Sequence, residues 1–549
     1  MQSFIQYRRL EATLRRQTKE WDAPGSLGPP SENEVERSHR DSPSSNSVQT
    51  THHSQTATPP SIPPAPNTAQ EQKTKGDELI MVGFDIADEE LNPRNWNLGK
   101  KIRATAIVLG AGLSGGWASA SDSTIIPQAK ATFGVSEVTE SLSTGLYLVA
   151  FGVGSLVSGP FSETVGRNPV YITALILFMI FVMASGLATN IGAQLIFRFF
   201  AGLFGCTAAT TFAGSVGDLW SPAERDIVLS ITSTANFCGV FLAPVVSSFI
   251  GQSTSLSWRW SEWVTLLISG LATTAIALCA PETYAPVILS WKAAQLRRLT
   301  GNTRFRSDLE VRLEPLWVRL LRSIRRPFWM FFHEVTVALF TAYLTVLYIV
   351  AFTFLTGFPF IYGDIYQFSQ GSIGLCFLSL DVGILLAGAM SLLIHKKYIR
   401  DMSHVKHEPS QQKRLPPEER LWFAMISAPC LPIGLFLIAW TSFSSITFWP
   451  SLVGSALIGF MFLGLFVSSY LYIIDAYEQF TASALGIATC VRYAAAGAMI
   501  PVSIPMYENL GAHWTLTLLG CISLLLTPLP YAFYKYGPAI RKRSSQMRS

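Results

Sequence analysis

The sequence predicts an all-α membrane protein with twelve transmembrane helices in two six-helix halves. Of its 549 residues, 49% are hydrophobic and 14% are charged, and the mean hydropathy of +0.32 is far from that of a soluble domain. Apolar stretches of about 20 residues, long enough to cross the hydrocarbon core, recur from residue 103 onward. The expected spans are 103–125, 142–161, 169–188, 194–216, 228–250, 263–281, 334–356, 371–394, 421–440, 448–474, 482–505 and 512–534.

Lysine and arginine are concentrated in the two longest connections between spans, which follow the sixth and the eighth span. The connections on the opposite side carry chiefly Lys130 and Arg259. By the positive-inside rule, both termini and the basic connections are expected to be cytosolic. A multi-pass protein of the plasma membrane is expected, with the vacuolar membrane as the alternative. The net charge of +5 is thus a topology signal, and no nucleic-acid partner is expected because no binding motif accompanies it.

The ends of the chain and its centre differ in composition from the spans. The first 75 residues are rich in Ser, Thr, Pro and Gln and are expected to be disordered. No removable signal peptide is expected, because Met1 is not followed by an apolar segment with a cleavage site. The expected domains are a cytosolic tail (1–75), a juxtamembrane segment (76–102), the first half (103–281), a basic cytosolic linker (282–333), the second half (334–534) and a C-terminal tail (535–549).

The sequence has no nucleotide-binding or metal-binding motif. It contains no G-x-x-x-x-G-K-[ST] phosphate loop, and its seven cysteines fall within predicted spans without metal-like spacing. We therefore expect a protein that is not an enzyme, needs no cofactor or metal, and uses an ion gradient for transport. Two halves of six spans are typical of transporters whose halves rock about a central substrate site.

The turn between the second and third spans carries a recognisable motif. The stretch 159-GPFSETVGRNPVYI-172 resembles the G-x-L-a-D-r-x-G-r-k signature of the major facilitator superfamily. Gly159, Glu163, Gly166 and Arg167 stand at its Gly, acid, Gly and Arg positions. The glycines would let the turn tighten, and a carboxylate beside a helix N-terminus is favoured by the helix dipole.

Further matches extend the resemblance to about residues 90–545. Arg198, Gly202 and Gly205 resemble the R-x-x-x-G-x-g signature of the fourth span, and 239-GVFLAPVVSSFIG-251, with Gly239 and Pro244, partly matches the fifth-span antiporter signature. The run 281-PETYAPVILSWKAAQLRRLTGN-302 resembles the fungal twelve-span drug:proton antiporter branch. The resemblance implies a major facilitator fold and export of drugs, toxins, polyamines or organic acids in exchange for protons.

Three of the charged residues within predicted spans are expected in the central cavity: Arg198, Asp381 and Arg492. An arginine at the centre of a span costs about 2.5–3.5 kcal/mol on insertion scales, so it is expected to have partners. Arg198 could bind an anionic substrate or shift the pKa of a neighbouring acid. We expect Asp381 to carry the proton, because a buried acid can change its protonation near neutral pH.

Asp122 and Glu262 lie near the outer ends of the first and sixth spans, where we expect gate or rim positions. The sequence thus predicts a proton-coupled exporter of small organic molecules, acting as a monomer in a lipid bilayer. An organic-acid or polyamine exporter of the same fold is an alternative. A nutrient sensor that no longer transports is an alternative of another class.

Overall fold

The computed structural model describes residues 1–21, 79–84, 91–311, 316–404, 416–477 and 480–544. These residues form two compact units. The larger comprises Met1–Ser3, Trp96–Tyr284 and Glu314–Ser549, and the smaller comprises Phe4–Asn95 and Ala285–Leu313. The larger unit contains the helix bundle in which the candidate site lies.

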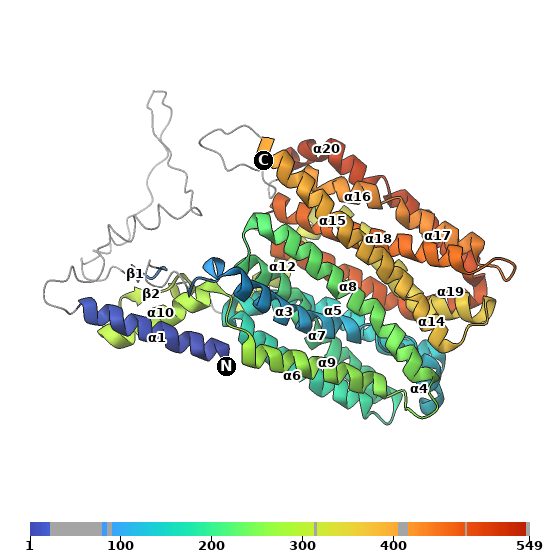
Figure 1. Cartoon of the computed structure of the whole chain (residues 1–549), viewed down its shortest axis with the longest axis horizontal. Helices are drawn as coiled ribbons and strands as arrows, with labels where there is room; N and C mark the ends of the chain where they lie inside the picture. Colours follow the sequence, from blue (N-terminus) through green and yellow to red (C-terminus); the bar gives the residue numbers. More distant parts are fainter. Residues whose placement is uncertain (22–78, 85–90, 312–315, 405–415, 478–479, 545–549) are drawn as a thin grey trace, which may run out of the picture. The chain divides into compact units, whose positions relative to one another are not determined.

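The larger unit is a helix bundle with two successive sets of helices (Figure 1). The first set is α3 (Leu98–Ala118), α4 (Ile126–Phe133), α5 (Glu137–Val165), α6 (Arg167–Gly186), α7 (Ile191–Leu219), α8 (Pro222–Gln252) and α9 (Trp260–Cys279). The second set is α12 (Leu316–His333), α13 (Val335–Phe358), η3 (Pro359–Ile365), α14 (Gln370–Cys376), α15 (Leu378–His404), η4 (Pro417–Leu421), α16 (Trp422–Ser427), α17 (Cys430–Thr441), α18 (Trp449–Tyr477), α19 (Thr481–Leu526) and α20 (Leu529–Arg543).

The described residues contain ten helices that are long and apolar enough to cross a membrane. The longest, Thr481–Arg541, covers the last two predicted spans, and Gly511 with φ 74° breaks its helical path. The first predicted span, 103–125, corresponds to α3, which is not among the ten. Its first turns carry lysine and arginine, its second half is rich in glycine, and it ends at Ala118, well before residue 125.

Close crossings between helices hold the two halves together. Helix α5 packs against α19, and α8 lies beside α15. At the first crossing, a Cβ atom on Gly497 would lie 2.4 Å from the Gly145 carbonyl oxygen, and one on Gly145 would lie 2.7 Å from the Gly497 carbonyl oxygen. Small residues of this kind let transmembrane helices approach to backbone contact. The same side-chain pattern that makes the helices apolar therefore also sets where they cross.

The smaller unit is formed by segments that the sequence assigns to the N-terminal tail, the juxtamembrane segment and the central linker. Its elements are most of α1 (Gln2–Trp21), β1 (Ile80–Met81), η2 (Pro93–Asn95), α10 (Ala285–Thr300), β2 (Phe305–Arg306) and α11 (Asp308–Val311). Strands β1 and β2 pair in parallel, and Leu10, Leu14, Leu296 and Phe305 form an apolar core. The structure therefore differs from the expected disordered tail over residues 2–21. Residues 22–75 lie outside the described residues.

Candidate functional site

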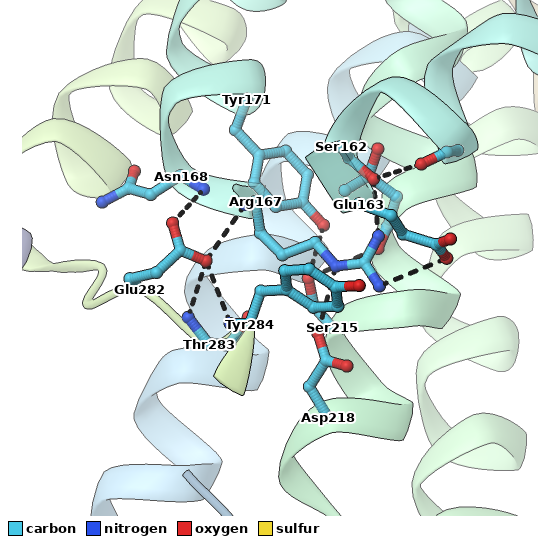
Figure 2. Close-up of polar contacts among 12 residues, drawn as sticks. Ser162, Glu163, Arg167, Asn168, Tyr171, Ser215, Asp218, Glu282, Thr283 and Tyr284 are labelled. Atoms are coloured by element: carbon cyan, nitrogen blue, oxygen red, sulfur yellow. Dashed lines mark hydrogen bonds and ion pairs between the residues drawn. The ribbon is translucent and has the colours of Figure 1, made fainter. Parts of the chain in front are cut away.

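Arg167 of the signature turn is held by several oxygen atoms at the start of α6 (Figure 2). It is 4% exposed. Its Nε donates to the Asp218 carboxylate at 3.0 Å, and its Nη1 donates to the Ser162 hydroxyl at 2.5 Å. Glu163, the acid that the motif predicts, lies 3.7 Å from Nη2 and its side chain is 46% exposed. The main partner of the signature arginine is thus Asp218 on α7.

A second carboxylate, Glu282, caps the N-terminus of α6 (Figure 2). Glu282 is fully buried and accepts hydrogen bonds from four backbone amides, those of Arg167, Asn168, Thr283 and Tyr284, at 3.0–3.1 Å. Burial raises the pKa of the Glu282 carboxyl, and the amides oppose that shift. A carboxylate at a helix N-terminus was expected here, and it comes from the PET motif rather than from the turn itself.

The signature glycines have different structural roles. Gly166 adopts φ 110°, and a Cβ atom there would lie 2.9 Å from the Glu282 carboxylate, so this position requires glycine. Gly159 lies within α5, where a Cβ atom would meet nothing within 4 Å. Gly202 matters for packing, because its Cβ atom would lie 2.1 Å from the Tyr147 carbonyl oxygen. The glycine of the fourth-span signature therefore lets α7 approach α5.

Arg198 is the centre of a buried ionic cluster. It is 0% exposed, and it forms ion pairs with Asp122 and with Glu262, whose Oε1 lies 3.2 Å from Arg198 Nε. Its Nη1 also donates to the Ala118 carbonyl at 3.2 Å, and the Tyr147 ring lies 5.7 Å from its guanidinium carbon. One positive charge therefore faces two carboxylates in a site that is closed to solvent.

The cluster differs from the sequence prediction at Asp122 and Glu262. We expected exposed rim or gate positions, but the two residues are 3% and 0% exposed. The cause is that α3 ends early, so that Asp122 lies in the bent segment after it. A further buried acid, Glu140, accepts a hydrogen bond from Gln194 at 3.0 Å. Sequence reasoning missed Glu140, which lies two residues before the predicted second span and in the first turn of the observed α5.

The bent segment also takes part in closing one end of the bundle. The Thr124 hydroxyl donates to the Pro244 carbonyl at 3.3 Å, and its own carbonyl accepts from Gln370 of the second half. The Gln128 amide donates to Gln370 at 2.8 Å. Pro244 thus supplies a carbonyl to this contact. Gly239 allows α3 and α8 to meet, since its Cβ atom would lie 2.5 Å from the Leu113 side chain.

A cavity of about 1240 Å³ lies between the two halves. Its wall includes Arg167 of the signature turn and Arg420 of η4, at the opposite end of the bundle from the Gln370 contact. Arg420 forms ion pairs with Asp226 of the first half and with Asp475 at 2.7 Å. These residues link the halves beside the cavity, and sequence reasoning did not identify them as a site.

Arg492 lines the cavity, whereas Arg198 and Asp381 do not. Asp381 is 7% exposed, interacts with the Cys238 thiol, and has one carboxylate oxygen without a partner. Arg492 is 4% exposed and lies against aromatic rings. The three residues that were expected to share one site therefore occupy three separate places.

No group of three or more His, Cys, Asp or Glu side chains that could hold a metal ion is found in the described part of the chain. The chemistry that these residues can perform is proton binding in the Arg198 cluster and solute binding in the cavity. A closed end and an accessible cavity suit a protein that changes access from one side to the other.

The chain is similar to known transporters over most of its length. A family model described as Major Facilitator Superfamily matches residues 107–501. The MFS-type transporter kojT of Aspergillus oryzae is 50% identical over 100% of both chains. The citrinin biosynthesis cluster MFS transporter mrr1 of Monascus ruber is 33% identical, covering 86% of this chain and 93% of its own. The ascochitine biosynthesis cluster MFS transporter of Didymella fabae is 34% identical, covering 84% and 89%.

Solved structures agree in fold. The proton:xylose symporter XylE, bound to 6-bromo-6-deoxy-D-glucose, superposes with a TM-score of 0.56 at 15% identity, covering 80% of this chain and 96% of its own. The human organic anion transporter MFSD10 gives a TM-score of 0.53 at 18% identity, covering 78% and 99%. At these identities the likeness concerns the fold alone.

Proposed function

Because the chain belongs to the Major Facilitator Superfamily, we propose that it exports a small organic molecule across the plasma membrane in exchange for protons. The observation that carries the proposal is the Arg198 cluster, in which one guanidinium faces two carboxylates within a buried site. With both acids ionised the three groups carry a net charge of −1. Binding of one proton makes the cluster neutral, so it leaves no uncompensated buried charge.

The position of Asp122 connects proton binding to opening of the closed end. Asp122 is two residues from Thr124, whose carbonyl accepts from Gln370 across the two halves. Breaking that contact would move the segment that carries Asp122 and give its carboxylate access to the outer solution. A proton bound there weakens the attraction to Arg198 and favours the open arrangement.

Relatives support a metabolite as the substrate. Two of them are named as transporters of the citrinin and the ascochitine biosynthesis clusters, and we extend export of a secondary metabolite to this chain. A drug or toxin as substrate is part of the same proposal. We also propose that both termini are cytosolic, on the strength of the lysine and arginine asymmetry.

The proposal moves the proton-binding role from Asp381 to Asp122 and Glu262. The test uses the full chain in inside-out membrane vesicles with an acidic lumen and a pH-sensitive dye inside them. Toxins, weak acids and polyamines are added in turn, and the dye reports proton release that accompanies uptake. We expect Asp122→Asn and Glu262→Gln to lose proton release, while Asp381→Asn, the matched control, retains it.

Two outcomes would contradict this assignment. Loss of proton release in Asp381→Asn, with both other variants active, would return the role to Asp381. Substrate uptake by the wild type that is unchanged when an ionophore dissipates the proton gradient would refute proton coupling itself.

A further inference from the structure

Arg492 is a buried guanidinium that interacts with the Tyr470 side chain but has no carboxylate partner among the described residues. Its side chain is 4% exposed, and Nε and Nη1 have no hydrogen-bond partner. None of the ion pairs among the described residues includes Arg492, in contrast to Arg167, Arg198 and Arg420. A buried cation without a counter-charge is costly. A ligand that brings a negative charge would remove that cost.

Aromatic rings surround this guanidinium. Its carbon lies 4.6 Å from the ring centre of Tyr348, 5.2 Å from Phe466, and 5.4 Å from both Tyr470 and Tyr493. All four rings line the cavity. Cation–π contact holds the guanidinium in place, while the ring faces offer flat apolar surface to a solute. The Tyr348 hydroxyl, which interacts with Tyr493, adds a hydrogen-bonding group to this wall of the cavity.

The charges around the cavity also favour an anion. Five arginines and three carboxylates line it, and two further carboxylates, Asp218 and Glu418, pair with Arg167 and Arg541 from outside the lining, whereas Arg492 forms no ion pair with a described residue. Each of the three carboxylates, Glu163, Asp226 and Asp475, already forms an ion pair with an arginine. A polyamine would therefore find no unpaired acid on the described cavity wall and would meet Arg492 as a like charge.

We propose that the cavity binds a planar, conjugated organic anion, with its carboxylate or equivalent acidic group on Arg492 and its ring system between Tyr348, Tyr470 and Tyr493. The inference rests on the proposed function and names its substrate class. The planar fork of arginine matches two oxygen atoms of one carboxylate. The aromatic rings then select a flat molecule over a saturated one of the same charge.

The test measures equilibrium binding to the purified full chain in lipid nanodiscs, without a proton gradient. The probe is naphthalene-2-carboxylate, compared with the neutral naphthalene-2-carboxamide and with the saturated decalin-2-carboxylate. We expect the wild type to prefer the naphthoate to both. Arg492→Gln should weaken naphthoate binding by about tenfold to a hundredfold, as expected for hydrogen bonds to a charged group, and Arg492→Lys should give a smaller loss.

Two further variants separate ligand binding from folding. Arg103→Gln removes an exposed arginine from α3 and should leave binding unchanged. Tyr348→Leu should reduce the preference for naphthoate over the saturated acid. The melting temperature of Arg492→Gln should equal or exceed that of the wild type, because the variant removes an unpaired buried charge.

The substrate class and the transport mechanism can fail separately. Equal binding of acid and amide, unchanged binding by Arg492→Gln, or no naphthoate binding by a folded wild type would overturn the anion site, whatever the protein transports. If naphthoate binding requires Arg492 but transport does not change when the proton gradient is dissipated, the anion site stands and proton-coupled export is refuted.

Discussion

Replacing Glu282 should destabilise the signature turn more than replacing the acid within the turn. Glu282 is fully buried and receives four backbone hydrogen bonds. Two of the donors belong to the first residues of α6, which have no acceptor within the helix. Glu282→Ala would remove the acceptor for all four amides, whereas Glu163→Gln would change a half-exposed side chain 3.7 Å from Arg167.

The expected loss can be sized from the four bonds. A buried donor left without an acceptor costs about 1–3 kcal/mol. Water entering the vacated space would satisfy part of the four, so we expect Glu282→Ala to lower the free energy of unfolding by about 3–5 kcal/mol. Because the entropy of unfolding scales with chain length, this corresponds to a fall in Tm of about 4 °C. Glu163→Gln should cost less than about 1 kcal/mol, as exposed ion pairs do.

The Glu282 variants also predict a sign for the pH dependence. Burial raises the pKa of Glu282, so between the ordinary and the raised pKa the folded chain binds a proton that the unfolded chain does not. The free energy of unfolding of the wild type should then increase as the pH falls through that window. Glu282→Gln has no proton to bind and should lack this increase.

The assay is thermal unfolding of the purified full chain in detergent, followed by tryptophan fluorescence at several pH values. Glu163→Gln is the matched control, because it changes the same charge beside the same arginine. Equal losses of Tm in Glu282→Ala and Glu163→Gln would refute the assignment of the cap. A Glu282→Gln variant with the wild-type pH dependence would refute the raised pKa.

Two other parts of the molecule give separate predictions. Asp226→Asn and Asp475→Asn should each lower the Tm modestly. The double variant should lower it by more than the two single changes added together, because only then is the buried Arg420 left without a carboxylate. Additive losses of Tm would contradict this. In the smaller unit, Arg297 lowers the pKa of Glu310 by a hydrogen bond, so the stability that this pair contributes is present above the ordinary glutamate pKa and is lost as the pH falls through the lowered pKa. The protection factors of the α10 amides, which are corrected for the intrinsic pH dependence of hydrogen exchange, should therefore fall on acidification in the wild type but not in Glu310→Gln. An equal response in both would refute the pairing.

Hydropathy identified the membrane spans because it depends only on neighbouring residues along the chain. The spans were predicted within a few residues where a straight apolar helix crosses the bundle, as for α7 (Ile191–Leu219). The prediction failed at the first span, where α3 stops at Ala118 and a bent polar segment follows. That segment carries Asp122, so the error in one helix end displaced a site residue from the rim to the interior.

The sequence by itself determined the family and the helical architecture, and it singled out Arg198 as a charge within an apolar run, since motif spacing and such a charge are local properties. It did not determine the partners of that charge. Only the packing of α7 against α9 and against the segment after α3 brings Asp122 and Glu262 to Arg198. Only the close approach of α5 to α7 at Gly202 brings the Tyr147 ring to its guanidinium. Likewise, aromatic rings surround Arg492 because α13 and α18 place Tyr348, Phe466 and Tyr470 around it. The ion pairs and hydrogen bonds of a buried charge come from groups that are distant in sequence, and so its role is decided by tertiary structure.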